Sequence, residues 1–143
     1  MIILEPYIRS ANYYETDQMG IIHHANYIRW FEEARVDFMN QLGFGYAQAT
    51  LSGVDFAVTG VSCEYKSMVR FGDTVQIETR ISFLSISRMS VRYHVNDVKT
   101  HELRAIGETN HCYFHNQRQC PVSLKKELPE LYDLFCEHYS ETT

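Results

Sequence analysis

Residues 27–42 are the feature that most constrains the fold, because their apolar side chains would cover most of the circumference of a helix. One stripe recurs at steps of three or four residues and further apolar residues widen it; the set comprises Tyr27, Ile28, Trp30, Phe31, Ala34, Val36, Phe38, Met39 and Leu42. Gly43 and Gly45 follow as helix stop signals. A helix that is apolar on most sides must be packed on most sides, so we expect the rest of the chain to surround it and only one side to reach water.

After residue 53 the apolar residues recur at every second position, which is typical of strands with one buried face. The alternation is clearest in residues 75–83 and 91–95. Turn signals at hairpin-like distances separate four such runs, at residues 71–73, 85–88, 96–97 and 115–117. We therefore predict a mainly antiparallel sheet. Residues 2–12 can add another strand, and the apolar positions of residues 124–135 predict one short amphipathic helix after Pro121.

The order of strand, loop, apolar helix and antiparallel strands predicts an α+β fold, in which a curved antiparallel sheet wraps around one long central helix. A length of 143 residues fits a single domain, residues 1–143. It leaves no room for a separate cofactor domain.

Charge and composition exclude several classes of protein. A formal net charge of −5 argues against broad nucleic-acid binding, which needs a basic face. No apolar run reaches the roughly 18 residues of a membrane span, and the first six residues lack the pattern of a secretory signal. The four cysteines are widely spaced, without a C-x-x-C pair, which favours reduced thiols. We predict a cytoplasmic protein.

Residues 12–27 are where we place the chemistry. In this segment one carboxylate, Asp17, lies in a glycine-containing loop that leads to the start of the long helix. A helix start offers unpaired N–H groups and the positive end of the macrodipole, so an aspartate facing it could attack, or activate water beside, a carbonyl polarised by those donors. Gly20 can take a positive φ and lets a ligand approach the backbone. The same aspartate could instead cap the helix or fix a turn, a common use of Asp before a helix.

We predict no metal site. Asp17, His23 and His24 offer suitable ligand types, but adjacent residues at a helix start diverge, so the two histidines would not face one ion. His111 and His115 share the face of a predicted strand and lie too far apart to chelate together. We expect chemistry without a metal or another cofactor.

Four segments together resemble a known family: YYETDQMGIIHHANY at residues 13–27, WFEEAR at 30–35 in the helix, VRFGD at 69–73 in a turn, and AIGETNH at 105–111 in a late strand. With them the chain resembles, over nearly its full length, the hotdog-fold acyl-CoA thioesterases of the 4-hydroxybenzoyl-CoA thioesterase type, including the Tol-Pal-associated branch. The chain has Glu15 where that family often has aspartate, and His23 where tyrosine is frequent. These departures bear on which acyl group is accepted.

The resemblance implies that Asp17 is the nucleophile or the general base in the hydrolysis of an acyl-CoA thioester to a free acid and CoA. It places the polarising backbone N–H near His24, whose side chain would orient substrate or water, and it aligns Tyr13 with a tyrosine of the Tol-Pal-like branch. A helix-end histidine and a packed strand tyrosine remain the alternative interpretations of these two residues. CoA needs basic groups near its phosphates, and of the arginines near predicted strand ends we expect Arg88 to bind them.

The resemblance also implies a homodimer whose two sheets join edge to edge and whose sites use both chains, with dimers pairing into a homotetramer. Another hotdog clade carries its catalytic carboxylate on the helix, which would point to Glu33; we favour a structural ion pair or hydrogen bond for Glu33 and Arg35. Two other functions stay open. One is a protein that binds acyl-CoA or an acyl carrier without turnover, and the other is a hotdog hydratase or dehydratase.

Overall fold

The computed structural model describes residues 3–139, so residues 1, 2 and 140–143 of the predicted domain lie outside the described residues, as does the first residue of the predicted 2–12 strand. One six-stranded sheet runs in the order β1-β3-β4-β5-β2, with β6 paired to β5, and every pair is antiparallel. Its strands are β1 (Tyr7–Ser10), β2 (Val54–Tyr65), β3 (Thr74–Leu84), β4 (Arg88–Asp97), β5 (Leu103–His115) and β6 (Cys120–Pro121). The four predicted runs after residue 53 and the extra N-terminal strand are therefore confirmed.

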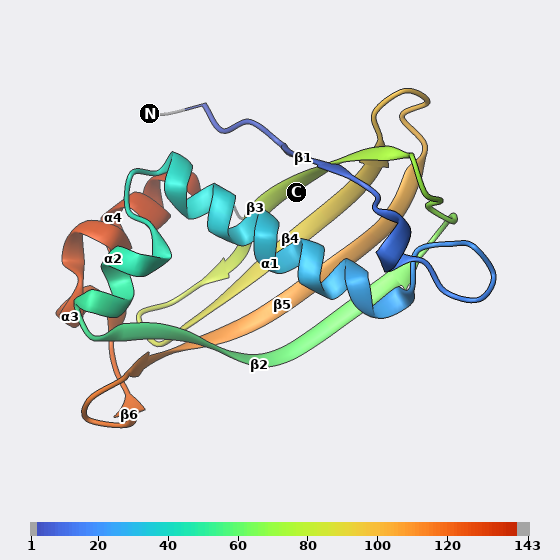
Figure 1. Ribbon diagram of the computed structural model, residues 1–143. Helices are drawn as coiled ribbons and strands as arrows, with labels where there is room; N and C mark the ends of the chain where they lie inside the picture. Colours follow the sequence, from blue (N-terminus) through green and yellow to red (C-terminus); the bar gives the residue numbers. More distant parts are fainter. Residues whose placement is uncertain (1–2, 140–143) are drawn as a thin grey trace.

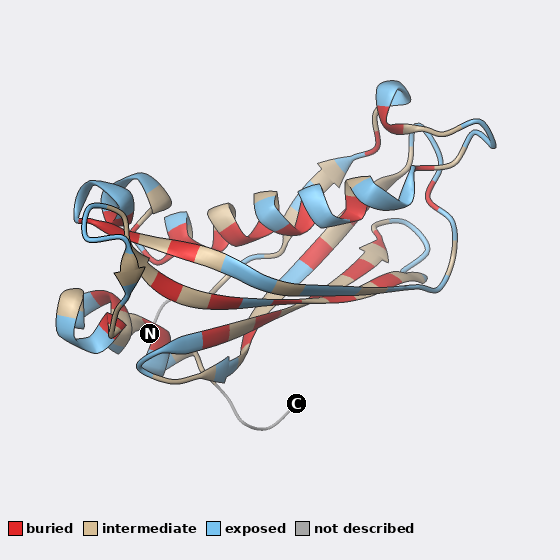
Figure 2. Ribbon diagram, turned by 90° about the horizontal axis from the view of Figure 1, so that it is seen from below, coloured by how far each residue is buried: buried red, intermediate tan, exposed pale blue. Residues whose placement is uncertain are grey.

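The long helix is α1 (His24–Gln41), which lies along one face of the curved sheet (Figure 1). It begins three residues before the predicted start at Tyr27, so the first turn contains His24. The side facing the sheet is buried, whereas Ala25, Ile28, Arg29 and Glu32 on the opposite side are exposed (Figure 2). The predicted α+β fold, a curled antiparallel sheet against a long central helix, is confirmed.

Close packing between α1 and the sheet depends on one missing side chain. The ring of Phe31 lies flat on that of Tyr93 in β4, with centroids 4.5 Å apart. A Cβ atom at Gly107 in β5 would lie 2.2 Å from Cε2 of Phe31. Gly107 therefore gives the aromatic ring the space to reach the sheet, since interiors have few voids and tolerate little overlap.

The ends of the chain differ from the sequence prediction in two places. A short helix, α2 (Tyr46–Leu51), follows the glycine stop signals and had no periodic pattern long enough to predict it. The single predicted C-terminal helix is two helices, α3 (Leu124–Glu127) and α4 (Pro129–His138). The break lies at Leu128, with φ −136° and ψ 72°, because a residue before proline is pushed out of the helical region.

These short helices gather at one end of the molecule, and the loop that follows the 3₁₀ turn η1 (Tyr13–Glu15) lies at the other end (Figure 1). Across residues 3–139, no helix combines the length and the apolar character needed to cross a membrane. β1 and β2 are the two edges of the sheet, and Val58, Val61 and Tyr65 of β2 are exposed.

Candidate active site

The loop that carries Asp17 is a tight turn closed by its own backbone. The N–H of Asp17 donates to the carbonyl of Ile21 at 2.8 Å, and the N–H of Gly20 donates to the carbonyl of Asp17 at 3.0 Å. Gly20 has φ +77°, as predicted for this position. The Oδ1 atom of Asp17 accepts from the N–H of Met19 at 2.8 Å, while Oδ2 has no hydrogen-bond donor among residues 3–139. One carboxylate oxygen thus holds the turn, and the other is free to act.

The start of α1 presents an unused donor. His23 is the N-cap residue, and its ring Nδ1 accepts from the N–H of Ala25 at 3.1 Å. Within the described chain, the N–H of His24 donates to no acceptor. The rings of His23 and His24 stack with centroids 4.1 Å apart. The first N–H groups of a helix carry its positive partial charge, so the His24 N–H is suited to polarise a carbonyl oxygen.

Asp17 and His24 line the same cavity, of about 300 Å³. Its other walls come from the loop, α1 and the end of β2, and the residues are Ile21, Ile22, Tyr27, Tyr65, Lys66, Ser67 and Met68. The structure therefore brings together the two residues that the sequence singled out, with Gly20 in the turn beside them. Chain segments far apart in the sequence form this cavity, so residues 65–68 had no signal of their own before the fold was known.

Tyr65 fixes the helix start from the strand side. Its hydroxyl donates to the carbonyl oxygen of His24 at 2.9 Å, and its ring meets that of Tyr27 edge-on at 5.0 Å between centroids. Partial burial of its hydroxyl and the neighbouring Cys63 raise the pKa of Tyr65 to about 12, so the hydroxyl keeps its proton at neutral pH. Lys66 also lines the cavity, and its Nζ pairs with the carboxylate of Glu64 at 2.9 Å.

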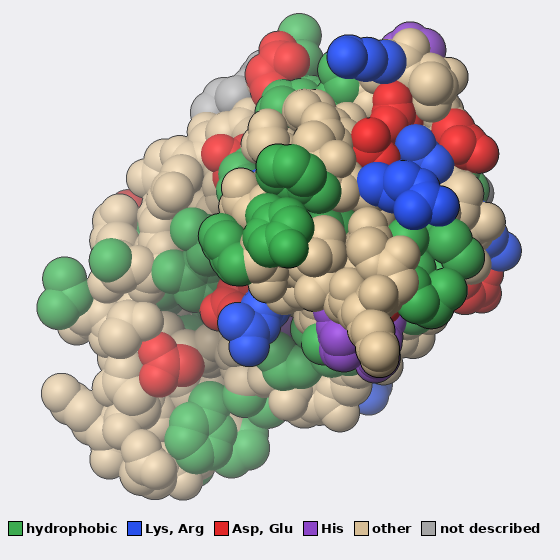
Figure 3. Space-filling view, turned by 45° about the vertical axis from the view of Figure 1, so that its right-hand side comes forward, with side chains coloured by type: hydrophobic (Ala, Val, Ile, Leu, Met, Phe, Trp, Pro, Cys, Tyr) green, Lys and Arg blue, Asp and Glu red, His purple; other side chains and the backbone are tan. Residues whose placement is uncertain are grey.

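Tyr13 lies outside this cavity. Its side chain is exposed and meets the ring of Phe71 edge-on, with centroids 5.7 Å apart. Hydrophobic groups gather on the surface at this end of the molecule (Figure 3), and Tyr14 and Met19 are also exposed there. The interpretation of Tyr13 as a tyrosine packed in the core is wrong, because the 3₁₀ turn directs it outward.

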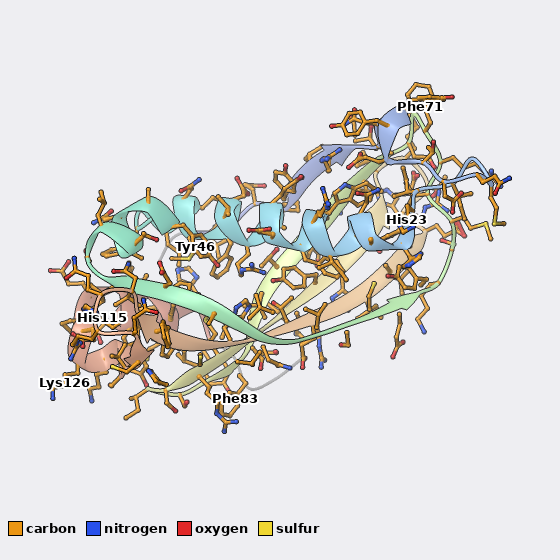
Figure 4. The ribbon with its side chains drawn as sticks, turned by 60° about the horizontal axis from the view of Figure 1, so that its bottom comes forward. His23, Tyr46, Phe71, Phe83, His115 and Lys126 are labelled. Atoms are coloured by element: carbon orange, nitrogen blue, oxygen red, sulfur yellow. The ribbon has the colours of Figure 1, made fainter. Side chains whose placement is uncertain are left out.

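Arg88, at the start of β4, is also remote from Asp17. It lines a separate cavity of about 390 Å³ together with Phe83, Ser90 and Asn110, and its guanidinium carbon lies 5.8 Å from the centre of the Phe83 ring. Figure 4 shows Phe83 on the underside of the sheet, away from His23 at the helix start. One chain alone does not bring Arg88 to the Asp17 cavity.

Glu15 is a buried carboxylate that the sequence revealed only as a departure from the family pattern. Its oxygens accept from Arg9, Trp30 and the N–H of Asn12, all between 2.8 and 3.0 Å. Arg9 also reaches Glu33, whose Oε1 lies 2.8 Å from the Nε of Arg9. The structural role predicted for Glu33 is confirmed, since this carboxylate pairs with Arg9 and accepts from the hydroxyl of Tyr7.

Arg35 lies at the head of a buried chain of hydrogen bonds. It donates to the hydroxyls of Tyr46 at 2.6 Å and Tyr93 at 3.0 Å. Tyr93 is linked to Thr109 at 2.7 Å, and Thr109 to His111 at 2.8 Å. Burial and the nearby charge of Arg35 lower the pKa of His111 to about 4, so this histidine is neutral at pH 7. The hydrogen-bonding role predicted for Arg35 is confirmed.

Comparison with known proteins decides the family. The sequence profile of the Thioesterase-like superfamily matches residues 12–132. The chain belongs to this superfamily. A protein of Aquifex aeolicus named "Putative esterase" is 34% identical over 125 residues, covering 87% of this chain and 94% of the relative. A Bacillus subtilis protein named "Putative acyl-CoA thioesterase YneP" is 29% identical over 125 residues, covering 87% and 90%.

Solved structures agree with this assignment. A DHNA-CoA thioesterase from Staphylococcus aureus superposes with a TM-score of 0.88 at 30% identity, covering 92% of this chain and 88% of that one. A hypothetical protein from Aquifex aeolicus reaches a TM-score of 0.82 at 32% identity, covering 90% and 99%. This member of the Thioesterase-like superfamily thus has the predicted hotdog fold and the predicted enzyme class, a thioesterase.

Proposed function

We propose that this protein hydrolyses acyl-CoA thioesters to a carboxylic acid and free CoA, with Asp17 as the reacting carboxylate and the N–H of His24 as the carbonyl donor. The observation that supports the proposal is the shared cavity, which is lined both by an aspartate with an unused oxygen and by the residue that has an unused helix N-terminal N–H. Relatives named as acyl-CoA thioesterases support the choice of CoA as the thiol.

The proposal covers two routes that use the same groups. In the first, an oxygen of Asp17 bonds to the carbonyl carbon, the C–S bond breaks, the CoA thiolate takes a proton from solvent, and water then hydrolyses the acyl-aspartyl anhydride. In the second, water attacks the carbonyl while Asp17 takes its proton, and the proton is passed to the departing thiolate. In both routes negative charge develops on the carbonyl oxygen. A backbone donor such as the His24 N–H is worth about 10² to 10³ in rate at that position.

We further propose that the protein belongs to the 4-hydroxybenzoyl-CoA thioesterase type, in the Tol-Pal-like branch, as the motifs at residues 13–27 and 69–73 suggest. Aromatic as well as aliphatic acyl groups are candidates, because the Staphylococcus aureus relative is named a DHNA-CoA thioesterase. The His24 side chain would orient substrate or water, and Gly20 would let the acyl group approach the backbone.

A homodimer joined through its β2 edges, which can pair into a tetramer, is part of this proposal. The open edge of β2 supports it, since an exposed long edge strand readily pairs with another strand. Tyr13 and Arg88, which lie outside the Asp17 cavity of their own chain, would then contribute to a site shared between the two protomers. The four free cysteines suit a reducing compartment such as the cytoplasm.

The test is release of free thiol from short, medium, long and aromatic acyl-CoAs by the wild type and by Asp17→Asn, which keeps the shape and removes the charge. We expect turnover of at least one acyl-CoA and its near-complete loss in the variant. Unchanged turnover in Asp17→Asn would remove Asp17 from the mechanism. Tight acyl-CoA binding without thiol release by the wild type would favour a binding protein.

A further inference from the structure

We infer that Glu15 is a positioning residue, which holds the Asp17 turn and the first turn of α1 in one arrangement and thereby sets the rate of the chemical step. The inference rests on the proposed function, because its effect on rate is exerted through Asp17 and the His24 N–H. Glu15 itself is buried and does not line the cavity.

The side chain of Glu15 ties together three separate parts of the chain. Arg9 of β1 donates to both carboxylate oxygens, at 2.8 Å each. The indole Nε1 of Trp30 in α1 donates to Oε2 at 2.9 Å, and the N–H of Asn12, before the 3₁₀ turn, donates to Oε1 at 3.0 Å. The carboxylate of Glu15 therefore accepts four hydrogen bonds in all. A single side chain therefore joins a strand, a turn and the long helix.

The backbone of Glu15 ties the same point to the helix start. Its carbonyl oxygen accepts from the N–H of His23 at 2.9 Å and from the side-chain Nδ2 of Asn26 at 2.9 Å. Directly after Glu15, Thr16 bridges to Ile22 and closes the loop that contains Asp17. Glu15 thus lies two residues before Asp17, the proposed reacting carboxylate. It contacts His23 and Asn26, which lie on either side of the pair His24 and Ala25.

These surroundings require a carboxylate and not merely a polar group. Every neighbour of the two oxygens is a donor, so a neutral amide at this position would turn its NH₂ group toward another donor. Burial by itself would raise the pKa of Glu15, but the hydrogen bonds from Asn12, Arg9 and Trp30 outweigh burial and lower the pKa. Glu15 is therefore ionised at neutral pH and fully engaged, which suits a fixed support and excludes it as the nucleophile.

Glu33 provides a matched comparison, because it is the other carboxylate bound to Arg9. Its side chain is 36% exposed, against 5% for Glu15, and it contacts Arg9 and Tyr7 but no part of the Asp17 loop. Loss of the Glu33 charge would weaken the Arg9 ion pair and leave the loop attached. Loss of the Glu15 charge would weaken the hydrogen bonds from Arg9, Asn12 and Trp30, and would leave only the backbone contacts to hold the loop against the helix start.

The experiment compares Glu15→Gln, Glu15→Asp and Glu33→Gln with the wild type, with kcat expressed per folded protein. A misplacement of about 1 Å can cost about 10²-fold in rate, so we expect Glu15→Gln to lower kcat by about 10²-fold with KM within about threefold. Glu15→Asp keeps the charge and should recover about a tenth of the wild-type kcat or more. Glu33→Gln should stay within about threefold. Wild-type kcat in Glu15→Gln, or an equal loss in Glu33→Gln, would overturn the inference.

Hydrogen exchange gives a second readout that does not need turnover. We expect faster exchange in peptides covering residues 16–26 of Glu15→Gln, at a temperature where it and Glu33→Gln are equally folded, and no such change in Glu33→Gln. If the wild type releases no thiol from any acyl-CoA, the proposed function fails, and exchange then decides whether Glu15 fixes this segment. Unchanged exchange at residues 16–26 in Glu15→Gln would reject the positioning role in either case.

Discussion

The hydroxyl of Tyr65, at the end of β2, donates a 2.9 Å hydrogen bond to the carbonyl oxygen of His24, in the first turn of α1. This bond links a strand at the edge of the sheet to a residue that lines the cavity and whose N–H has no acceptor in the described chain. Glu15, which is bound by Arg9 of β1 at the other edge of the sheet, reaches the N-cap of the same helix through the N–H of His23. The helix start is thus held from two sides, which is a requirement for a donor that must meet a developing charge without rearrangement.

Tyr65→Phe removes only the hydroxyl of this bond. We expect a loss of about 1 kcal/mol in the free energy of unfolding and a kcat lowered about tenfold, because the first turn gains freedom. Tyr7→Phe is the control, since it also removes one tyrosine donor, to Glu33, away from the cavity. It should show the stability loss and keep kcat within about threefold. Equal kcat values for the two variants would refute the role of Tyr65 at the helix start. The measurements are urea unfolding and thiol release.

Gly20→Ala tests the Asp17 turn. Gly20 has φ +77° and nothing lies within 4 Å of an added Cβ, so the substitution strains the backbone without a clash. Gly43→Ala, at the other end of α1, has the same properties, with φ +85°. Both variants should lose about 1 to 2 kcal/mol in the free energy of unfolding, the usual cost of a left-handed residue with a side chain. Only Gly20→Ala should also lower kcat. A similar fall in kcat for Gly43→Ala would show that the loss is not local to the turn.

Gly107→Ala tests the packing of α1 on the sheet. The added methyl group would lie 2.2 Å from Phe31, whose ring is confined against Tyr93. Overpacking of this kind typically costs about 1 to 3 kcal/mol. We expect the free energy of unfolding to fall by that amount, and the denaturation midpoint to fall with it. In Gly60→Ala the nearest atom would be the side-chain Nδ2 of Asn110, at 3.0 Å, and this flexible group can move. A midpoint as high for Gly107→Ala as for Gly60→Ala would contradict the tight contact.

His111 should make stability depend on pH. Its pKa in the folded protein is about 4, below the usual 6.5, because burial and the charge of Arg35 disfavour the protonated ring. Between pH 6.5 and 4 the unfolded chain binds the proton and the folded chain does not, so stability falls as the pH falls, by up to about 3 kcal/mol. His111→Gln should show a flatter dependence in urea unfolding at pH 7, 6, 5 and 4. Parallel curves for the two proteins would show that His111 does not contribute this effect.

Much of the architecture was predictable from local patterns. The period of two in residues 75–83 and 91–95 predicted β3 and β4, and the apolar stripe of residues 27–42 predicted α1, because a buried face imposes its period on the sequence. The six-residue helix α2 was not predictable in this way, since it is too short to show a period. Pro129 indicates a break at Leu128, but the apolar pattern on both sides of it favoured the prediction of one continuous helix.

The sequence by itself determined the strand and helix pattern, the thioesterase resemblance and the choice of Asp17 and His24, because these depend on residue spacing along one segment. Only the tertiary structure decided that Tyr65 and Lys66 line the same cavity as Asp17, that Glu15 is engaged by Arg9 and Trp30, and that Tyr13 and Arg88 lie outside the cavity of their own chain. The physical reason is that such contacts join residues brought together by the curvature and register of the sheet. A linear pattern of side chains does not encode these distances locally.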